Sequence, residues 1–130
     1  MSMKIPAQGY ELKIKRVYED SSDEDGYRIL VDRIWPRGIS KERAKIDVWE
    51  KEVAPSTELR KRFNHISSRY AEFVKMYEEE LSANCECSNF LEKCMTYLKH
   101  SNVTFVYGTK SETENNAKVL RDWALMNSML

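Results

Sequence analysis

The residues best suited to chemistry in this sequence are basic and lie in two separated segments. Arg33 and Arg37 follow one apolar run, and Lys110 follows another where a helix is expected to begin. Guanidinium and ammonium groups bind phosphates and carboxylates, and the first turn of a helix adds unpaired N–H groups. If the two segments meet, they predict a site for a small anionic or phosphorylated ligand.

Polar side chains beside these cations complete the predicted site. The ligand-binding residues expected from the sequence are Arg33, Arg37, Lys110, Ser111, Asn115 and Asn116. Asp32 is the only candidate for a general base. The sequence does not decide between a binding protein and an enzyme, and the reaction, ligand identity, cofactor and oligomeric state stay open.

An ordinary structural role is the alternative explanation for each cation. In this explanation Arg33 and Arg37 pair with Asp32 or Asp47, and Lys110 is a solvated surface lysine, because exposed ion pairs are common and weak. A convergence of three cations from two segments is harder to explain in this way. We therefore expect the group, rather than any single member, to mark a site.

A second hypothesis uses the basic segment Arg28–Lys45, which holds six basic and two acidic residues. Trp35 and Trp49 lie in or near it, and aromatic rings among basic residues can bind single-stranded nucleic acid. Tryptophan at such spacing is, however, usually a core residue. A module that binds nucleic acid or protein is therefore the alternative function.

The cysteines and histidines favour structural roles. Cys85, Cys87 and Cys94 lack the paired CxxC spacing of a structural zinc site, so no metal site is expected. His65 and His100 lie near the ends of predicted helices, where a cation is mildly stabilising.

Composition sets outer limits on function. A chain of 130 residues with 42% apolar residues suits a single domain, 1–130, and 21 basic residues balance 21 acidic ones. That balance argues against a nucleic-acid coat protein or a polybasic membrane binder. No apolar run is long enough to span a bilayer, and Met1–Tyr10 does not resemble a secretory signal. Three cysteines suggest reduced thiols, so we expect a cytoplasmic protein.

Three apolar runs predict strands. Leu12–Val17 alternates apolar and basic residues, which is typical of a half-exposed strand. Arg28–Arg33 and Val103–Tyr107 have continuous apolar centres, which suit strands covered on both faces. The acidic run Glu19–Asp25 between the first two strands predicts a solvated loop.

Helical signals fill the rest of the chain. Asp47 with Glu50, and Ser111 with Glu114, resemble capping boxes, and Ser56 can cap a helix after Pro55. Apolar stripes predict two long helices; their members are Tyr70, Phe73, Tyr77 and Leu81, then Phe90, Leu91, Cys94, Tyr97 and Leu98.

These elements predict an α/β fold, a small open sheet of about three strands with a long helical crossover and helices packed on it. The crossover favours a parallel second and third strand, whereas the short first loop suggests a hairpin. Ligands in such sheets bind beyond the carboxyl ends of the strands. A type I turn over Trp35–Gly38 is expected to fix Arg37 there.

The chain resembles the short, YeaO-like branch of the domain-of-unknown-function 488 family over most of its length. The resemblance rests on the segments Gly26–Gly38, Trp49–Glu52 and Ala54–Arg60, with Tyr107, Lys110 and Asn115–Leu120. It implies a small α/β domain without an established activity.

Departures from the family pattern limit the possible chemistry. In longer members the third strand ends in a cysteine and a Cys-His-Arg triplet opens the next helix, whereas this chain has Tyr107 and Asn115-Asn116-Ala117. The position of Asn116 is commonly histidine in the short branch. Because asparagine does not exchange a proton near neutral pH, the resemblance supports no thiol or imidazole mechanism at this corner.

Overall fold

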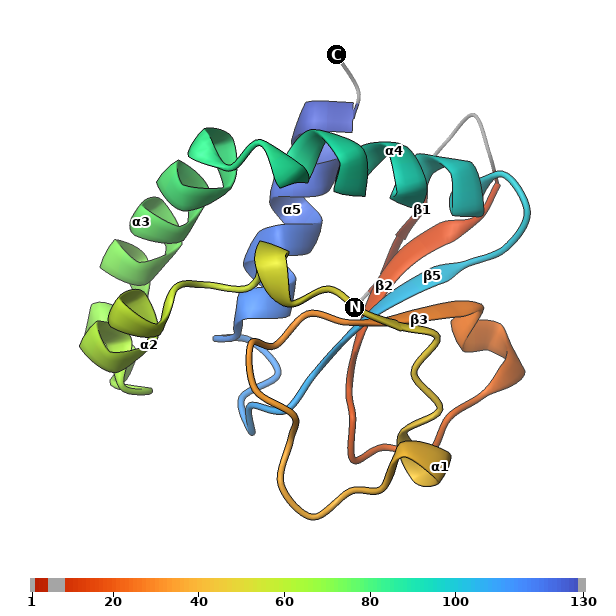
Figure 1. The fold of residues 1–130 in the computed structure, drawn as a ribbon, viewed down its shortest axis with the longest axis horizontal. Helices are drawn as coiled ribbons and strands as arrows, with labels where there is room; N and C mark the ends of the chain where they lie inside the picture. Colours follow the sequence, from red (N-terminus) through yellow and green to blue (C-terminus); the bar gives the residue numbers. More distant parts are fainter. Residues whose placement is uncertain (1, 5–8, 129–130) are drawn as a thin grey trace.

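The computed structural model describes residues 2–4 and 9–128 and contains a five-stranded sheet (Figure 1). The strands are β1 (Ser2–Lys4), β2 (Glu11–Arg16), β3 (Tyr27–Leu30), β4 (Val48–Trp49) and β5 (Val103–Tyr107). Their order in the sheet is β1-β2-β5-β3-β4, and all neighbours are parallel except the antiparallel β1–β2 pair. The α/β class and the parallel pairing of the second and third predicted strands are confirmed.

The helices are α1 (Lys41–Ala44), α2 (Thr57–Phe63), α3 (Tyr70–Ala83), α4 (Glu86–Leu98) and α5 (Asn116–Ser128). Three short 3-10 turns accompany them, η1 (Asp23–Asp25), η2 (Lys51–Val53) and η3 (Ser67–Arg69). Figure 1 shows α1 on its own loop, apart from the other four helices. None of the described helices is both long and apolar enough to cross a membrane.

The main core lies between one face of the sheet and α2–α5. Phe105 and Ile29 on the strands belong to the same buried cluster as Tyr77 of α3, Phe90 of α4 and Leu120 of α5. The two apolar stripes predicted from the sequence lie on α3 and α4 and bury most of their members, as a helix with one apolar face requires.

The opposite face of the sheet is covered by the loop between β3 and β4, which carries α1. Leu30 and Val106 pack there in a smaller cluster with Ile39. Trp35 and Trp49 meet edge to face at 5.5 Å, and the Trp49 indole N–H donates to the Asp32 carbonyl at 2.6 Å. Both tryptophans thus fasten the start of this loop to the sheet.

The predicted hairpin between the first two strands is wrong. β5 lies between β2 and β3 and is parallel to both. All five residues of β5 are buried, so the most apolar strand takes the centre of the sheet, where both of its edges are paired.

Two predicted helix starts are also wrong. The Asp47 carboxylate accepts a hydrogen bond from the Arg28 N–H at 2.8 Å, which supports β4 beside β3 instead of a helix. The last helix begins at Asn116, because the Asn115 side chain accepts from the Lys118 N–H at 2.8 Å. The Ser111 hydroxyl accepts from Glu114 in a turn that precedes this helix.

The predicted turn falls one residue later, on Arg37 and Gly38, and Gly38 takes a left-handed φ of 74°. The Ser56 cap is confirmed, since its hydroxyl accepts from the Leu59 N–H at 3.1 Å.

The amino end of β3 is closed by a buried charge network. Asp25, 1% exposed, contacts the Arg28 guanidinium at 2.6 Å and the Lys15 ammonium at 3.1 Å. The Arg28 guanidinium, in a residue 3% exposed, also donates to the Ala44 carbonyl at 2.7 Å. Burial opposes ionisation of Asp25, but the Ser22 N–H and the two cations outweigh it and lower its pKa below 3.8.

Candidate functional site

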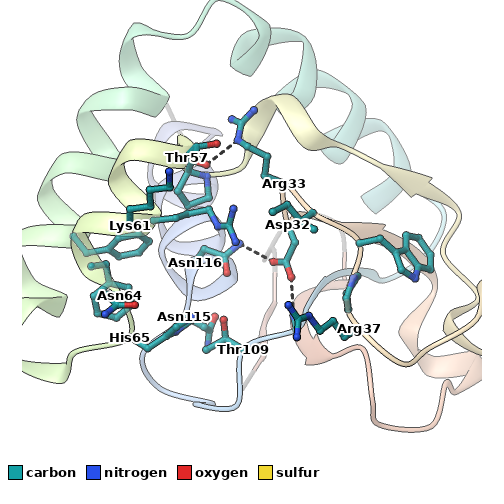
Figure 2. A pocket seen from close by; sticks show the side chains of 18 of the residues that line it. Asp32, Arg33, Arg37, Thr57, Lys61, Asn64, His65, Thr109, Asn115 and Asn116 are labelled. Carbon is teal, nitrogen blue, oxygen red and sulfur yellow. Dashed lines mark hydrogen bonds between the residues drawn. The ribbon is translucent and has the colours of Figure 1, made fainter.

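The carboxyl end of the sheet opens into a pocket of about 620 Å³, a size common for small-molecule sites. Three segments supply most of its lining: the loop after β3 (32–37), the end of the loop before α2 together with that helix and its exit (55–65), and the loop from β5 to α5 (108–116). Tyr18 and Phe73 complete it. Figure 2 shows Asp32 and Asn116 facing each other, with Arg37 to one side and Lys61, Asn64 and His65 to the other. The site therefore lies where parallel strands end, as expected for such sheets.

Asp32 lies at the floor of this pocket and is held by neutral donors. Its Oδ1 accepts from the Asn116 amide at 3.1 Å, and its Oδ2 accepts from the Gly108 N–H at 2.9 Å. The Asn116 amide also donates to the Val31 carbonyl at 3.0 Å. The carboxylate thus joins the end of β3 to the end of β5 and the start of α5.

Burial raises the pKa of Asp32 above its ordinary value of 3.8. The hydrogen bonds from Asn116 and Gly108, and then the positive charges of Arg60 and His65, offset only part of this effect. The carboxyl group therefore lies in an environment that disfavours its charge.

Glycine follows β5 because the Asp32 carboxylate approaches the backbone there. A Cβ atom at Gly108 would lie 3.1 Å from Asp32 Oδ2 and 3.4 Å from Pro36 Cβ. Ordinary contacts are longer, so a side chain at this position would displace the carboxylate from the floor.

The walls of the pocket are strongly basic. Its lining includes Arg33, Arg37, Arg60, Lys61 and His65, and among the described residues only Asp32 contributes a carboxylate to it. Arg33 is already engaged, because its guanidinium donates to the Pro55 and Ala54 carbonyls at 3.0 Å each.

The side chains of Arg37, Arg60 and Lys61 are exposed and, among the described residues, have no hydrogen-bond or ion-pair partner. Like charges that share a pocket repel one another, so an entering anion would be favoured by all three.

α2 presents two of these cations because its other face is buried. Leu59 and Phe63 point into the core, which leaves Arg60 and Lys61 on the outer side of the short helix. Two consecutive non-glycine residues then adopt left-handed φ values, 46° at Asn64 and 55° at His65. This uncommon backbone turns the chain sharply and places both side chains in the lining of the pocket.

Comparisons with known proteins identify the family. A family model described as the inactive DUF488-N3 subclade matches residues 11–129. The chain belongs to the DUF488 family.

The alignments of this DUF488 protein with its relatives cover nearly the whole length of each relative. The uncharacterized protein YeaO of Escherichia coli is 43% identical over 112 residues, which cover 86% of this chain and 95% of YeaO. The uncharacterized proteins Rv3073c of Mycobacterium tuberculosis and Mb3100c of Mycobacterium bovis are each 40% identical over 109 residues, covering 84% of this chain and 89% of theirs. No solved structure matches the chain. The YeaO-like resemblance seen in the sequence is confirmed.

The structure brings together only part of the set of site residues predicted from the sequence. Arg33, Arg37, Asn115 and Asn116 line the pocket. Lys110 is exposed and, like Ser111, is absent from the lining, because α5 begins several residues after them.

The two asparagines differ in what they offer. Asn115 is 1% exposed, and both ends of its side-chain amide are engaged, since it donates to the Ser111 carbonyl at 3.0 Å and accepts from the Lys118 N–H. Asn116 is partly exposed and uses its amide hydrogens on Val31 and Asp32, which leaves its carbonyl oxygen without a donor among the described residues.

Sequence reasoning missed Arg60, Lys61 and His65. The inward spacing of Leu59 and Phe63 predicts that Arg60 and Lys61 face outward, but nothing local indicates that they line the same pocket as Asp32. His65 was expected near a helix end and lies just after the end of α2, with its ring 5.8 Å from that of Phe63; its place in the lining of the pocket was not foreseen.

The Arg28–Lys45 segment is less exposed than the nucleic-acid hypothesis assumed. Arg28 is buried against Asp25, Arg33 is bound to backbone carbonyls, and both tryptophans pack in the smaller core cluster. The ring faces needed to stack on bases are therefore largely used within the fold.

The cysteines lie away from this pocket. Cys87 and Cys94 are buried, and burial raises the pKa of Cys87 to about 11 and that of Cys94 further still. Cys85 is exposed, and all three thiols are free. The two buried thiols pack as core residues in the main cluster.

Proposed function

We propose that this protein binds a small anionic or phosphorylated ligand in the pocket at the carboxyl ends of β3 and β5. One observation carries the proposal: Arg37, Arg60 and Lys61 line a pocket of ligand size, and in the described part of the chain their side chains have no hydrogen-bond or ion-pair partner. A single exposed ion pair contributes little, but several cations around one concave site bind phosphate or carboxylate oxygens together.

The proposal is for binding rather than for a reaction. The positions that carry cysteine and histidine elsewhere in the family hold Tyr107 and Asn116, and the matching subclade is described as inactive. Burial raises the pKa of Tyr107 to about 12, so its hydroxyl stays protonated near neutral pH. Each oxygen of Asp32 accepts one hydrogen bond that ties the end of β3 to the start of α5 or to the end of β5.

Thermal unfolding in the presence of pyrophosphate tests the proposal. A ligand at about 100 times its dissociation constant stabilises the folded state by about 2.7 kcal/mol. We expect pyrophosphate to raise the melting temperature of the wild type and of Lys41→Ala, in which an exposed lysine outside the pocket is removed. The double variant Arg60→Ala/Lys61→Ala should lose most of this rise.

Two outcomes would contradict the proposal. One is a wild type that responds to none of phosphate, pyrophosphate, sulfate and citrate. The other is a double variant that responds as strongly as Lys41→Ala, since binding would then not involve the pocket.

A further inference from the structure

The two ends of the pocket differ in hydrogen-bonding character. Its rim carries the cationic donors of Arg37, Arg60 and Lys61, whereas its floor presents oxygen atoms of Asp32 and Asn116. A ligand that fills both ends must therefore accept at one end and donate at the other.

The orientation of the Asn116 amide is fixed by its partners. Its nitrogen faces two acceptors, the Val31 carbonyl at 3.0 Å and Asp32 Oδ1 at 3.1 Å, so both amide hydrogens are used. The Asn116 Oδ1 receives no hydrogen bond from any residue that the structure describes. It is left as an acceptor beside the carboxylate.

Asp32 also keeps acceptor capacity. Each of its oxygens accepts one hydrogen bond, from Asn116 and from Gly108, whereas a carboxylate oxygen can accept two. The floor thus repels an anionic group and favours a group with O–H bonds.

Apolar side chains also line the pocket. The lining includes Trp35, Pro36, Pro55, Phe63 and Phe73. Such walls suit the C–H faces of a carbon skeleton, and a volume of about 620 Å³ exceeds what an inorganic anion alone would fill.

Resting on the proposed function, we infer that the ligand is a phosphorylated polyol: its phosphate binds Arg37, Arg60 and Lys61, and its hydroxyl groups donate to Asp32 and Asn116.

Titration calorimetry with a matched pair of phosphate esters tests this inference. Glycerol 3-phosphate and n-propyl phosphate share a three-carbon chain and a phosphate, and only the first has hydroxyl groups. We expect the wild type to bind glycerol 3-phosphate about 10-fold more tightly, because hydrogen bonds to a charged group are worth about 1.5 kcal/mol or more. Asp32→Ala should weaken glycerol 3-phosphate more than n-propyl phosphate and so abolish the preference, and Arg60→Ala should weaken both esters equally.

The outcomes separate this inference from the proposed function. Equal affinity of the wild type for the two esters overturns the polyol assignment and leaves anion binding standing; this comparison needs no variant. A preference that survives in folded Asp32→Ala also overturns it, as does tighter binding of phosphoethanolamine than of glycerol 3-phosphate, which would indicate an amine. If no phosphate ester binds, the polyol inference fails, and the melting experiment with pyrophosphate decides whether anion binding stands.

Discussion

A largely buried aspartate lies at each end of β3, and the two differ in the charge of the groups that surround them. At the amino end Asp25 contacts Lys15 and Arg28, and its pKa is lowered. At the carboxyl end Asp32 is held by neutral amide donors and its pKa is raised, and the side chains of Arg37, Arg60 and Lys61 have no ion-pair partner in the described part of the chain. Charge compensated within the fold stabilises structure, whereas charge left uncompensated around a pocket is available to a ligand.

Removing Asp25 should produce the largest loss of stability. Asp25→Ala leaves the Arg28 guanidinium buried without its counter-ion, and breaking a buried ion pair in this way costs about 3–5 kcal/mol. Urea unfolding of Asp25→Ala and Asp32→Ala measures the contrast. If Asp32→Ala were the less stable of the two, the amino end of β3 would not be its structural end, and this assignment would be contradicted.

The next largest losses of stability are expected from alanine substitutions at Gly26 and Gly108. At Gly26, φ is 64° and an added Cβ would lie 2.0 Å from the Asn102 carbonyl oxygen, so Gly26→Ala should destabilise the fold by about 2–4 kcal/mol. At Gly108 the nearest atom is Asp32 Oδ2, at 3.1 Å, which can shift into the pocket. Gly108→Ala should therefore cost less stability but weaken ligand binding, as melting and titration would show; the opposite ranking would contradict the comparison.

The pH dependence of stability should have opposite signs at the two aspartates. Because the pKa of Asp25 is lowered, its stabilisation is present above pH 3.8 and is lost as the pH falls through the folded-state pKa. Because the pKa of Asp32 is raised, its contribution is present below pH 3.8 and is lost as the pH rises through the folded-state pKa. Relative to wild type, Asp25→Asn should thus be most destabilising near neutral pH and Asp32→Asn most destabilising in acid. Parallel trends in thermal melts from pH 3 to 7 would count against these assignments.

The smallest effect on stability is expected at the rim. Arg37→Ala and Lys61→Ala remove exposed side chains without described partners, so the free energy of unfolding should change by no more than about 0.5 kcal/mol without ligand. The same variants should lose most of the stabilisation by pyrophosphate. A large loss of stability without ligand would mean that these cations are structural.

The sequence predicted the central elements because their signals are local. The apolar runs of β2, β3 and β5 and the stripes of α3 and α4 indicate their own structure. The two-residue β4 carries too little pattern to be recognised, and Asp47 before it looked like a helix cap until its non-local partner, the Arg28 N–H, was known.

The site was only partly predictable for the same reason. Strand order placed Arg37 and Asn116 at one edge of the sheet, as the sequence suggested. The position of α2 beside the pocket depends on the packing of Leu59 and Phe63 and on the left-handed turn at Asn64. No local pattern of the sequence indicates either. Lys110 was expected at a helix start that the Asn115 cap moved further along the chain.

Amide chemical shifts during a pyrophosphate titration test the central claim most directly, because both ends of β3 report in one spectrum. We predict that shifts concentrate at residues 60–65, Gly108 and Asn116, while Asp25 and Arg28 stay unchanged. Saturable shifts at the amino end with none at the pocket, or no saturable shifts at all, would contradict the claim that uncompensated cations mark the binding end of the sheet.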